Sequence, residues 1–137
     1  MSPSADLHCV PPELVDRMWP LVGHWIEAAA RRTRAMHTPT VRASLQDRQA
    51  LLWVALAGGE VIAAAVTELE VGDDGLSCRI VAAGGRDAGA WAPLIHGIED
   101  FARAEGCVRV RFEGRTGWRR YHPDYAVKRV VFEKELA

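Results

Sequence analysis

The chain has 137 residues, of which 49% are hydrophobic and 26% charged, and its formal net charge is −1. This composition excludes a disordered or collagen-like protein, and the length predicts a single domain over residues 1–137. The longest apolar runs, such as Val61–Val66, are too short to cross a bilayer, and the N-terminus lacks the pattern of a signal peptide. We therefore expect a cytoplasmic protein without a membrane partner.

The first predicted element is an amphipathic helix that begins near Pro12. Proline suits the first turn of a helix, and Glu13 suits its positive end. Apolar residues then recur at helical spacing and predict a core-facing stripe: Leu14, Met18, Leu21, Val22, Trp25 and Ile26. Pro20 lies inside this pattern, so we expect a kink or a break near Trp19. A second, shorter helix is predicted over residues 41–49.

Three strands are predicted next, over Leu51–Ala57, Val61–Val71 and Leu76–Ala83, because these segments are rich in apolar and β-branched residues. Gly58-Gly59 between the first two is a hairpin signal. The Gly-Asp-Asp-Gly sequence at residues 72–75 is a second turn. The three strands should form an antiparallel meander.

A strand–helix–strand unit follows. Gly84, Gly85 and Gly89 stand between the third strand and a helix that ends at Gly106, and such a junction offers backbone N–H groups to a phosphate. Residues 108–112 alternate apolar and charged side chains, which is typical of a strand. The two strands should lie parallel with a right-handed crossover. The sequence thus predicts an α/β (α+β) fold with a mixed sheet and helices on both faces.

The C-terminal part is strongly basic. A short helix and loop are predicted over residues 115–125, and a last strand over Val127–Leu136 with Val130 and Phe132 on one face. From Arg109 onward there are eight Lys/Arg against four Asp/Glu. Such an excess is typical of a surface that meets an anionic ligand or an acidic partner, and equally of a solvated mixed-charge face.

The cysteines and histidines indicate no metal. Cys9, Cys78 and Cys107 are far apart and form no C-x-x-C pair, so neither a disulfide framework nor a zinc site is expected, and we interpret them as small buried hydrophobes. The five histidines show no ligand spacing. His122, beside a tyrosine, is the one histidine that merits a test as a base.

The order of these elements resembles the GNAT superfamily of acyl-CoA-dependent N-acyltransferases. In that family the turn after the fourth strand carries (Q/R)-x-x-G-x-(G/A), whose backbone amides hold the pyrophosphate of acetyl-CoA. Residues 86–91 read Arg-Asp-Ala-Gly-Ala-Trp, so the arginine and first glycine match, while Trp91 replaces the last small residue. Trp91 also fits the core stripe of its helix, and Asp87 adds a negative charge or caps the helix.

The resemblance implies that acetyl-CoA or another acyl-CoA is the cofactor and that a small-molecule or protein amine is the acceptor. The implied cofactor-binding residues are Ile80, Ala82, Gly84, Gly85, Arg86 and Gly89. Glu68 and Glu70 lie two apart on one face of a strand and are candidates for the base that deprotonates the amine. Tyr121 and Tyr125 are approximate counterparts of the family's tyrosine acid, although the usual F-Y-x-x-x-G-F pattern is absent. We take Tyr121 as the candidate.

A more specific resemblance is to short GNAT-like proteins of phage and prophage genes, which share four motifs. These are an L-W strand, a G-G turn before a tryptophan-bearing helix, A-R-x-x-G-C and G-R-x-G-W. They occur here at residues 52–53, 84–85, 102–107 and 114–118. This resemblance implies an alternative function without catalysis, as a structural protein with a virion or self-assembly partner.

The segment at residues 114–120 reads Gly-Arg-Thr-Gly-Trp-Arg-Arg and should line the same cleft as the glycine-rich turn. Its glycines permit close backbone approach, and its arginines could bind phosphate or carboxylate. The alternative is that Trp118 fills the gap as core while the arginines pair with Glu113 or Asp124. Basic and aromatic residues alternate only in this one strip, and the sequence has no known nucleic-acid-binding module, so we do not expect a nucleic-acid partner.

Overall fold

The computed structural model describes residues 5–33, 38–114, 116–130 and 132–136. Its centre is a five-stranded sheet with the order β1-β2-β3-β4-β5. The strands are β1 (Asp6–Val10), β2 (Ala50–Ala57), β3 (Glu60–Gly72), β4 (Gly75–Gly85) and β5 (Arg109–Phe112). The first four strands pair antiparallel, and β5 lies parallel to β4. The predicted mixed sheet is therefore confirmed.

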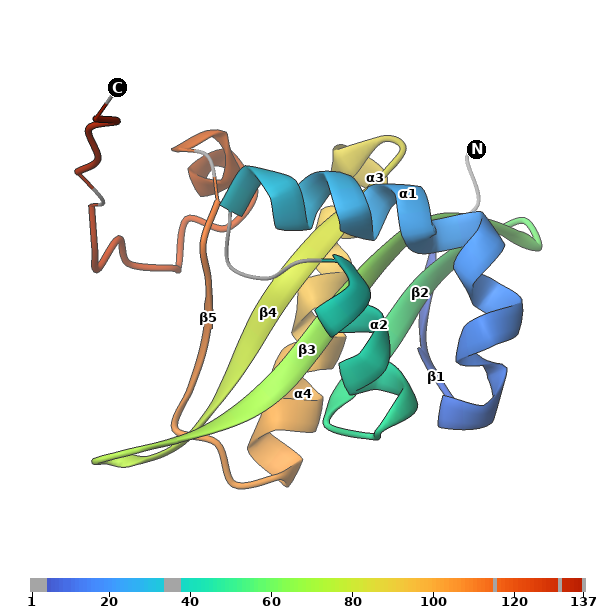
Figure 1. Cartoon of the computed structure of the whole chain (residues 1–137), viewed down its shortest axis with the longest axis horizontal. Coiled ribbons are helices and arrows are strands. Elements are labelled where there is room, and N and C mark those ends of the chain that lie inside the picture. The colour runs from blue at the N-terminus through green and yellow to red at the C-terminus, as the bar shows by residue number, and fades with distance from the viewer. Residues whose placement is uncertain (1–4, 34–37, 115, 131, 137) are drawn as a thin grey trace.

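Helices cover both faces of the sheet (Figure 1). The α-helices are α1 (Val15–Thr33), α2 (Thr38–Gln46), α3 (Ala88–Trp91) and α4 (Ile95–Ala104). Three short 3-10 helices complete the elements, η1 (Pro12–Leu14), η2 (Ala92–Leu94) and η3 (Thr116–Arg120). Helices α1 and α2 lie on one face of the sheet, and α4 crosses the other (Figure 1). The predicted α/β class is confirmed.

Two buried clusters fill the two sides of the sheet. Between the sheet and α1–α2, the largest fully buried side chains are Val15, Val22, Ile26, Val41, Leu45, Leu52 and Val66. Between the sheet and α4, the cluster holds Trp53, Cys78, Ile80, Ile95 and Ile98, with Phe101 and Phe112 packed against it. Alternate residues of β2, β3 and β4 enter opposite clusters, because successive side chains of a strand point to opposite faces.

Helix α1 runs from Val15 to Thr33 with Pro20 inside it. Its ribbon changes direction sharply along its length (Figure 1). A proline removes one backbone N–H donor and clashes with the carbonyl four residues earlier, which bends a helix. The helix is therefore kinked and unbroken, which is the first of the two expected outcomes.

The meander forms as predicted. Gly58 and Gly59 have φ angles of 59° and 78°, and the turn they make joins β2 to β3. Two consecutive positive φ angles fit a type I′ turn, whose twist matches that of the strands, and glycine adopts them without strain. Gly72 and Gly75 close the second hairpin as facing partners.

Helix α2 ends earlier than predicted. Its last residue is Gln46, whereas the sequence pattern indicated Gln49. Arg48 takes a left-handed φ of 62°, and the N–H of Gln49 donates to the carbonyl of Ser44. This is the hydrogen bond of a Schellman motif, which terminates a helix.

Three further predictions were wrong or incomplete. Strand β1 was not predicted, and it forms the edge of the sheet beside β2. Cys9 lies on that edge strand and is exposed, not buried as expected. In the predicted last strand Val127–Leu136, the described residues have no strand structure. A segment becomes a strand only by pairing with a neighbour, and local alternation does not supply one.

A buried hydrogen bond joins β2 to β3. The indole N–H of Trp53 donates to Oγ1 of Thr67 over 2.9 Å, and Thr67 is only 1% exposed. Thr67→Val keeps the shape but leaves the indole N–H without its acceptor. We expect the free energy of unfolding to fall by about 2 kcal/mol, measured by urea denaturation. The double variant with Trp53→Phe should lose less than the sum of the single variants, and full additivity would contradict a coupled pair.

Candidate functional site

The candidate site lies where β4 and β5 separate. The two strands pair from Ser77 with Arg109 to Ile80 with Phe112. Strand β5 ends there, whereas β4 continues to Gly85. Beyond Ile80, the β5 side of β4 therefore has no neighbouring strand among the described residues, and its main-chain groups on that side can bind a ligand.

The glycine-rich turn follows the free end of β4. Gly84 packs on α1, since a Cβ added there would lie 3.1 Å from Cβ of Trp25. Gly85 crosses β3 so closely that an added Cβ would lie 2.4 Å from the carbonyl oxygen of Ile62. That same oxygen accepts the backbone N–H of Arg86 over 2.8 Å. The turn is thus fixed by backbone contacts with β3 and α1.

The charged residues of the turn are Arg86 and Asp87. The guanidinium of Arg86 pairs with Glu60 at the start of β3 over 2.7 Å. Asp87 precedes α3 with a left-handed φ of 50°, so it occupies the predicted N-cap position, but its side chain makes no capping hydrogen bond. Gly89 lies beside Tyr121, whose Cε1 is 4.0 Å from the position of an added Cβ. The structure therefore brings two predicted site residues, Gly89 and Tyr121, together.

An aromatic cluster lies across the opening between β4 and β5. Its members come from α3, β5, η3 and the segment after η3: Trp91, Phe112, Trp118, Tyr121, His122 and Tyr125. The ring centroids of Trp91 and Trp118 are 5.4 Å apart. This contact joins α3, which follows β4, to η3, which follows β5. Trp118 also lies so close to Gly114 that an added Cβ would meet Cδ1 at 2.8 Å. The space that Gly114 leaves is therefore filled by the Trp118 ring.

Trp91 leaves one polar atom without a partner. Its indole Nε1 is buried and makes no hydrogen bond among the described residues. A buried donor without an acceptor costs roughly 1–3 kcal/mol, so such a group usually has a partner in the working protein. This donor lies at the opening between the strands, where a ligand oxygen could accept it.

The two candidate bases lie on β3 in a network of charges. Arg79 of β4 reaches both Glu68 and Glu70 over 3.4 Å, so the two carboxylates share one face as predicted. Glu70 also pairs with Arg111 of β5 over 3.1 Å. Glu68 is opposite Arg79 in the β3–β4 register, next to the last paired residue Ile80. Of the two, Glu68 is therefore nearer the opening.

A second hydrogen-bond network ties the C-terminal segment to α4. The hydroxyl of Tyr125 donates to Glu99 over 2.8 Å, and Nδ1 of His96 is 2.9 Å from the other oxygen of Glu99. Burial and this carboxylate raise the pKa of Tyr125 well above its usual value. Burial raises the pKa of Glu99, but the hydrogen bonds from His96 and Tyr125 outweigh it and lower the pKa overall. Sequence reasoning missed this network, because only tertiary contact joins residues 99 and 125.

His122 is buried in the aromatic cluster, stacked on Trp118 with an interplanar angle of 12°. Burial lowers its pKa below the ordinary 6.5, and His96 adds to this effect, while Asp124 and Glu99 oppose it. Because the unfolded chain binds the proton more readily than the folded one, protonation of His122 favours unfolding. The free energy of unfolding is therefore highest above pH 6.5 and decreases as the pH falls through the lower pKa of the folded state.

We expect a measurable consequence of this burial. Between pH 7 and 5.5 the melting temperature of the protein should fall more than that of His122→Phe, which keeps an aromatic ring and removes the titrating group. Differential scanning calorimetry at a series of pH values measures both. Parallel pH curves for the two proteins would contradict this role of His122.

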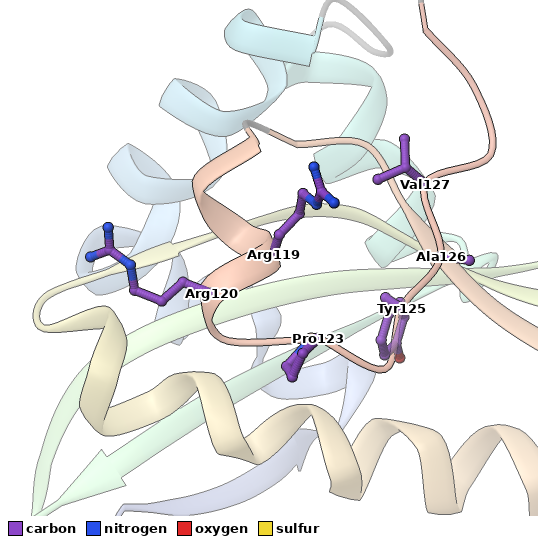
Figure 2. A pocket seen from close by; sticks show the side chains of 6 residues that line it. All are labelled: Arg119, Arg120, Pro123, Tyr125, Ala126 and Val127. Atoms are coloured by element: carbon purple, nitrogen blue, oxygen red, sulfur yellow. The ribbon is translucent and has the colours of Figure 1, made fainter.

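A pocket of about 600 Å³ lies beside η3, lined by Arg119, Arg120, Pro123, Tyr125, Ala126 and Val127 (Figure 2). The guanidinium groups of Arg119 and Arg120 point in different directions (Figure 2). Neither arginine forms an ion pair with Glu113 or Asp124 in the described part of the chain. The remaining arginine of this motif, Arg115, lies outside the described residues.

Neither a metal centre nor a membrane span emerges from the described residues. Over residues 5–33, 38–114, 116–130 and 132–136, no three His, Cys, Asp or Glu side chains are grouped to hold a metal ion. No helix within these ranges has both the length and the apolar character needed to cross a membrane.

No protein-family model and no curated protein matches the sequence. The structure is similar to a ribosomal-protein-alanine N-acetyltransferase from Brucella melitensis biovar Abortus 2308, with a TM-score of 0.67 and 14% identity over 98% of this chain and 100% of that one.

Two further solved structures share the fold. An aminoglycoside acetyltransferase from an uncultured soil metagenomic sample, in complex with sisomicin, gives a TM-score of 0.69 and 12% identity over 97% of both chains. A predicted acetyltransferase from Clostridium acetobutylicum, solved with acetyl-CoA, gives 0.63 and 11% over 97% of this chain and 96% of that one. At these identities the similarity shows the fold, which is that of the GNAT acetyltransferases.

Proposed function

We propose that this chain is an acyl-CoA-dependent N-acyltransferase that acts on an amine, and that residues 1–137 form one catalytic domain. The observation that carries the proposal is the separation of β4 from β5 after Ile80, directly before a glycine-rich turn. The acetyltransferase names of the similar structures support it, as does the presence of acetyl-CoA in one of them.

The opening offers groups suited to an acyl-CoA. The main chain of Ile80 and Ala82 lies along the free side of β4, where it can bind the amides of an extended ligand arm. Gly84, Gly85, Arg86 and Gly89 form the turn proposed for the pyrophosphate. The unpaired indole N–H of Trp91 is a further donor for a ligand oxygen. Bound acyl-CoA would supply a thioester carbonyl for attack by the amine.

The proposed proton transfers use two residues. As the amine nitrogen bonds to the carbonyl carbon and the C–S bond breaks, Glu68 takes the amine proton directly or through water. Tyr121, beside Gly89, gives a proton to the departing sulfur. Glu70 is the second candidate for the base. It pairs with both Arg79 and Arg111, so its main role is to hold these two arginines in place.

The acceptor is proposed to be a small-molecule or protein amine. Among the similar structures, one is named for acetylation of a ribosomal-protein alanine and another for acetylation of aminoglycosides, which supports an amine in either class. The carboxylates Glu68 and Glu70 lie on the α1–α2 face of the sheet, where they could attract a cationic amine.

A second candidate function is a GNAT-fold domain without catalysis, used as a phage- or prophage-derived structural protein. The contact of Trp91 with Trp118 across the opening favours it, since a ligand arm must displace or bypass these rings. Asp87 favours it too, because a carboxylate beside the turn repels a pyrophosphate. The partner that the resemblance to phage proteins implies is a virion protein or a second copy of the chain.

One experiment separates the two functions. Acetyl-CoA is titrated into the full chain by calorimetry, with coenzyme A as a second ligand, and release of the free thiol is then followed with a panel of aminoglycosides and alanine-ended peptides. Micromolar binding with thiol release supports the transferase. Absence of binding by both ligands would exclude it and leave the non-catalytic function.

A further inference from the structure

The hairpin of β3 and β4 extends beyond the neighbouring strand β2. Strand β2 begins at Ala50, which lies opposite Glu68, whereas β3 continues to Gly72. On the β2 side, no strand of the described chain therefore pairs with Leu69–Gly72, which we call the β3 edge. In Figure 1 the hairpin projects past the rest of the sheet at the lower left. The β3 edge is thus open although β3 lies in the middle of the strand order.

The backbone of the β3 edge has groups that point outward. Gly72 and Gly75 face each other across the two-residue turn, so the N–H and C=O groups of Gly72 point toward β4. These groups alternate in direction along an antiparallel strand. Those of Leu69 and Val71 therefore point away from β4, toward the side that β2 does not reach. Proteins usually cover such a row or shield it with charges.

Apolar side chains lie exposed on the same edge. Leu69 and Val71 are 39% and 89% exposed. They follow Thr67 at intervals of two residues, and Thr67 faces α4, since its hydroxyl accepts from the tryptophan indole buried under that helix. Leu69 also lines a cavity of about 270 Å³ together with Leu51 and Phe101. Exposed leucine and valine beside a partly apolar cavity are typical of a surface that a partner covers.

The charges around the β3 edge are mainly negative. Glu70 lies between the two exposed apolar residues and points to the opposite face of the sheet, where it pairs with arginines of β4 and β5. A carboxylate has room for further donors. Asp73 in the turn is exposed and forms no ion pair within the described ranges. Of the described residues that line the cavity, Glu68 and Glu105 are acidic and Arg48 is basic.

We propose that the β3 edge binds an extended peptide of a partner protein, which adds a strand to the sheet in line with β2. The peptide lies antiparallel to β3, as β2 does. Its residues opposite Val71 and Leu69 are apolar, and the one opposite Leu69 enters the cavity. Its residue opposite Glu70 is lysine or arginine. In this mode of recognition main-chain hydrogen bonds supply affinity, and pockets for alternate side chains supply specificity.

The charges favour such a peptide over a second copy of the chain. Two copies that both use the outward groups of Leu69 and Val71 must pair about Glu70, which lies midway between these residues. One Glu70 would then face the other across the two-fold axis, and like charges directly opposite destabilise a strand pair. A peptide with a basic residue at this position meets no such repulsion.

Fluorescence anisotropy with labelled synthetic peptides tests the proposal on the full chain. The probe is a short peptide that alternates leucine and lysine. One control peptide alternates leucine and glutamate, and a second carries N-methyl groups on the leucines, which removes the donors that face β3. The probe should bind at least about 10-fold more tightly than either control. Absence of binding by the probe, or equal binding by the N-methylated peptide, would overturn the proposal.

Variants at Val71 locate the binding site. Val71→Pro removes the outward N–H and leaves the bonds between β3 and β4 intact, so the melting temperature should change little. Val71→Lys replaces the apolar contact with a charge that repels the probe. Each should weaken binding by about 10-fold or more. Val108→Lys is the matched control, because Val108 is also exposed and lies in the same row of the sheet on the far side of β4. Unchanged binding by both Val71 variants would overturn the proposal.

Two further measurements separate strand addition from the alternatives. With saturating probe, amide hydrogen exchange at Val71 should slow by about 10-fold or more, while that of Gly72, whose N–H points toward β4, should stay the same. An unprotected Val71 amide in the bound state would overturn strand addition. Light scattering after size exclusion tests the second copy. A dimer that Val71→Pro dissociates, combined with no binding of the probe, would overturn the peptide and assign the β3 edge to self-association.

Discussion

Gly85→Ala is expected to lower the free energy of unfolding by about 3 kcal/mol. The added Cβ would lie 2.4 Å from the carbonyl oxygen of Ile62 and 2.5 Å from Cβ of Ala63. Both belong to β3, whose backbone is held by pairing with β2 as well as β4, so it cannot move away without breaking hydrogen bonds. Guanidinium denaturation of the two proteins measures the difference.

Gly117→Ala is the matched control for this change. Gly117 lies in η3, and a Cβ added there meets nothing within 4 Å. Its stability should stay within about 0.5 kcal/mol of the unaltered protein. If Gly85→Ala were as harmless as Gly117→Ala, the close crossing of the turn over β3 would be wrong, and the turn would have to sit farther from the sheet.

Local signals were enough to predict the central part of the fold. The Gly58-Gly59 hairpin, the turn at residues 72–75 and the alternation at residues 108–112 are each encoded within a few neighbouring residues. Strand β1 carries no such signal, because Asp6–Val10 is a short edge strand of mixed polarity whose structure depends on pairing with β2. The last predicted strand failed for the converse reason, since its alternation is local but its partner is not.

In the candidate site, too, the features with a local sequence signal could be predicted, and those that depend on a distant partner could not. The glycine-rich turn and the shared face of Glu68 and Glu70 follow from chain order and strand periodicity. The arginine between those carboxylates could not be predicted, because the pairing of Arg79 with Glu68 depends on a register shift between Val66 and Thr67. A bulge of this kind changes which residues face each other and leaves no clear mark in the sequence.

The aromatic cluster could be only half predicted. The sequence allowed two positions for Trp118, at the opening or as core, and the structure combines them: the ring packs on Phe112 and Gly114 while it closes the gap toward Trp91. Chain order alone could not place Tyr121 beside Gly89, because η3 must first fold back across the turn. The site is therefore assembled by contacts between segments distant in sequence.

Glu68→Gln is expected to lower kcat/KM of the proposed transferase by roughly 100-fold, the lower end of what a general base contributes. Glutamine keeps the shape of the side chain and an oxygen that can accept from Arg79, so the charge network loses one carboxylate without losing its packing. Initial rates of thiol release across a pH series measure the effect. The rise in rate with pH that a base produces should disappear in this variant.

Glu70→Gln is the matched variant, because it makes the same change two residues farther along β3. Glu70 is opposite Ser77, within the part of β4 that is still paired with β5, and it is held by both Arg79 and Arg111. Its loss should therefore reduce the rate by less than about 10-fold and leave the pH dependence intact, since a carboxylate that only positions others contributes less than a base. A larger loss for Glu70→Gln would transfer the role of base to that residue. Equal losses, with a lowered melting temperature in both variants, would assign the pair to structure and remove Glu68 from the reaction.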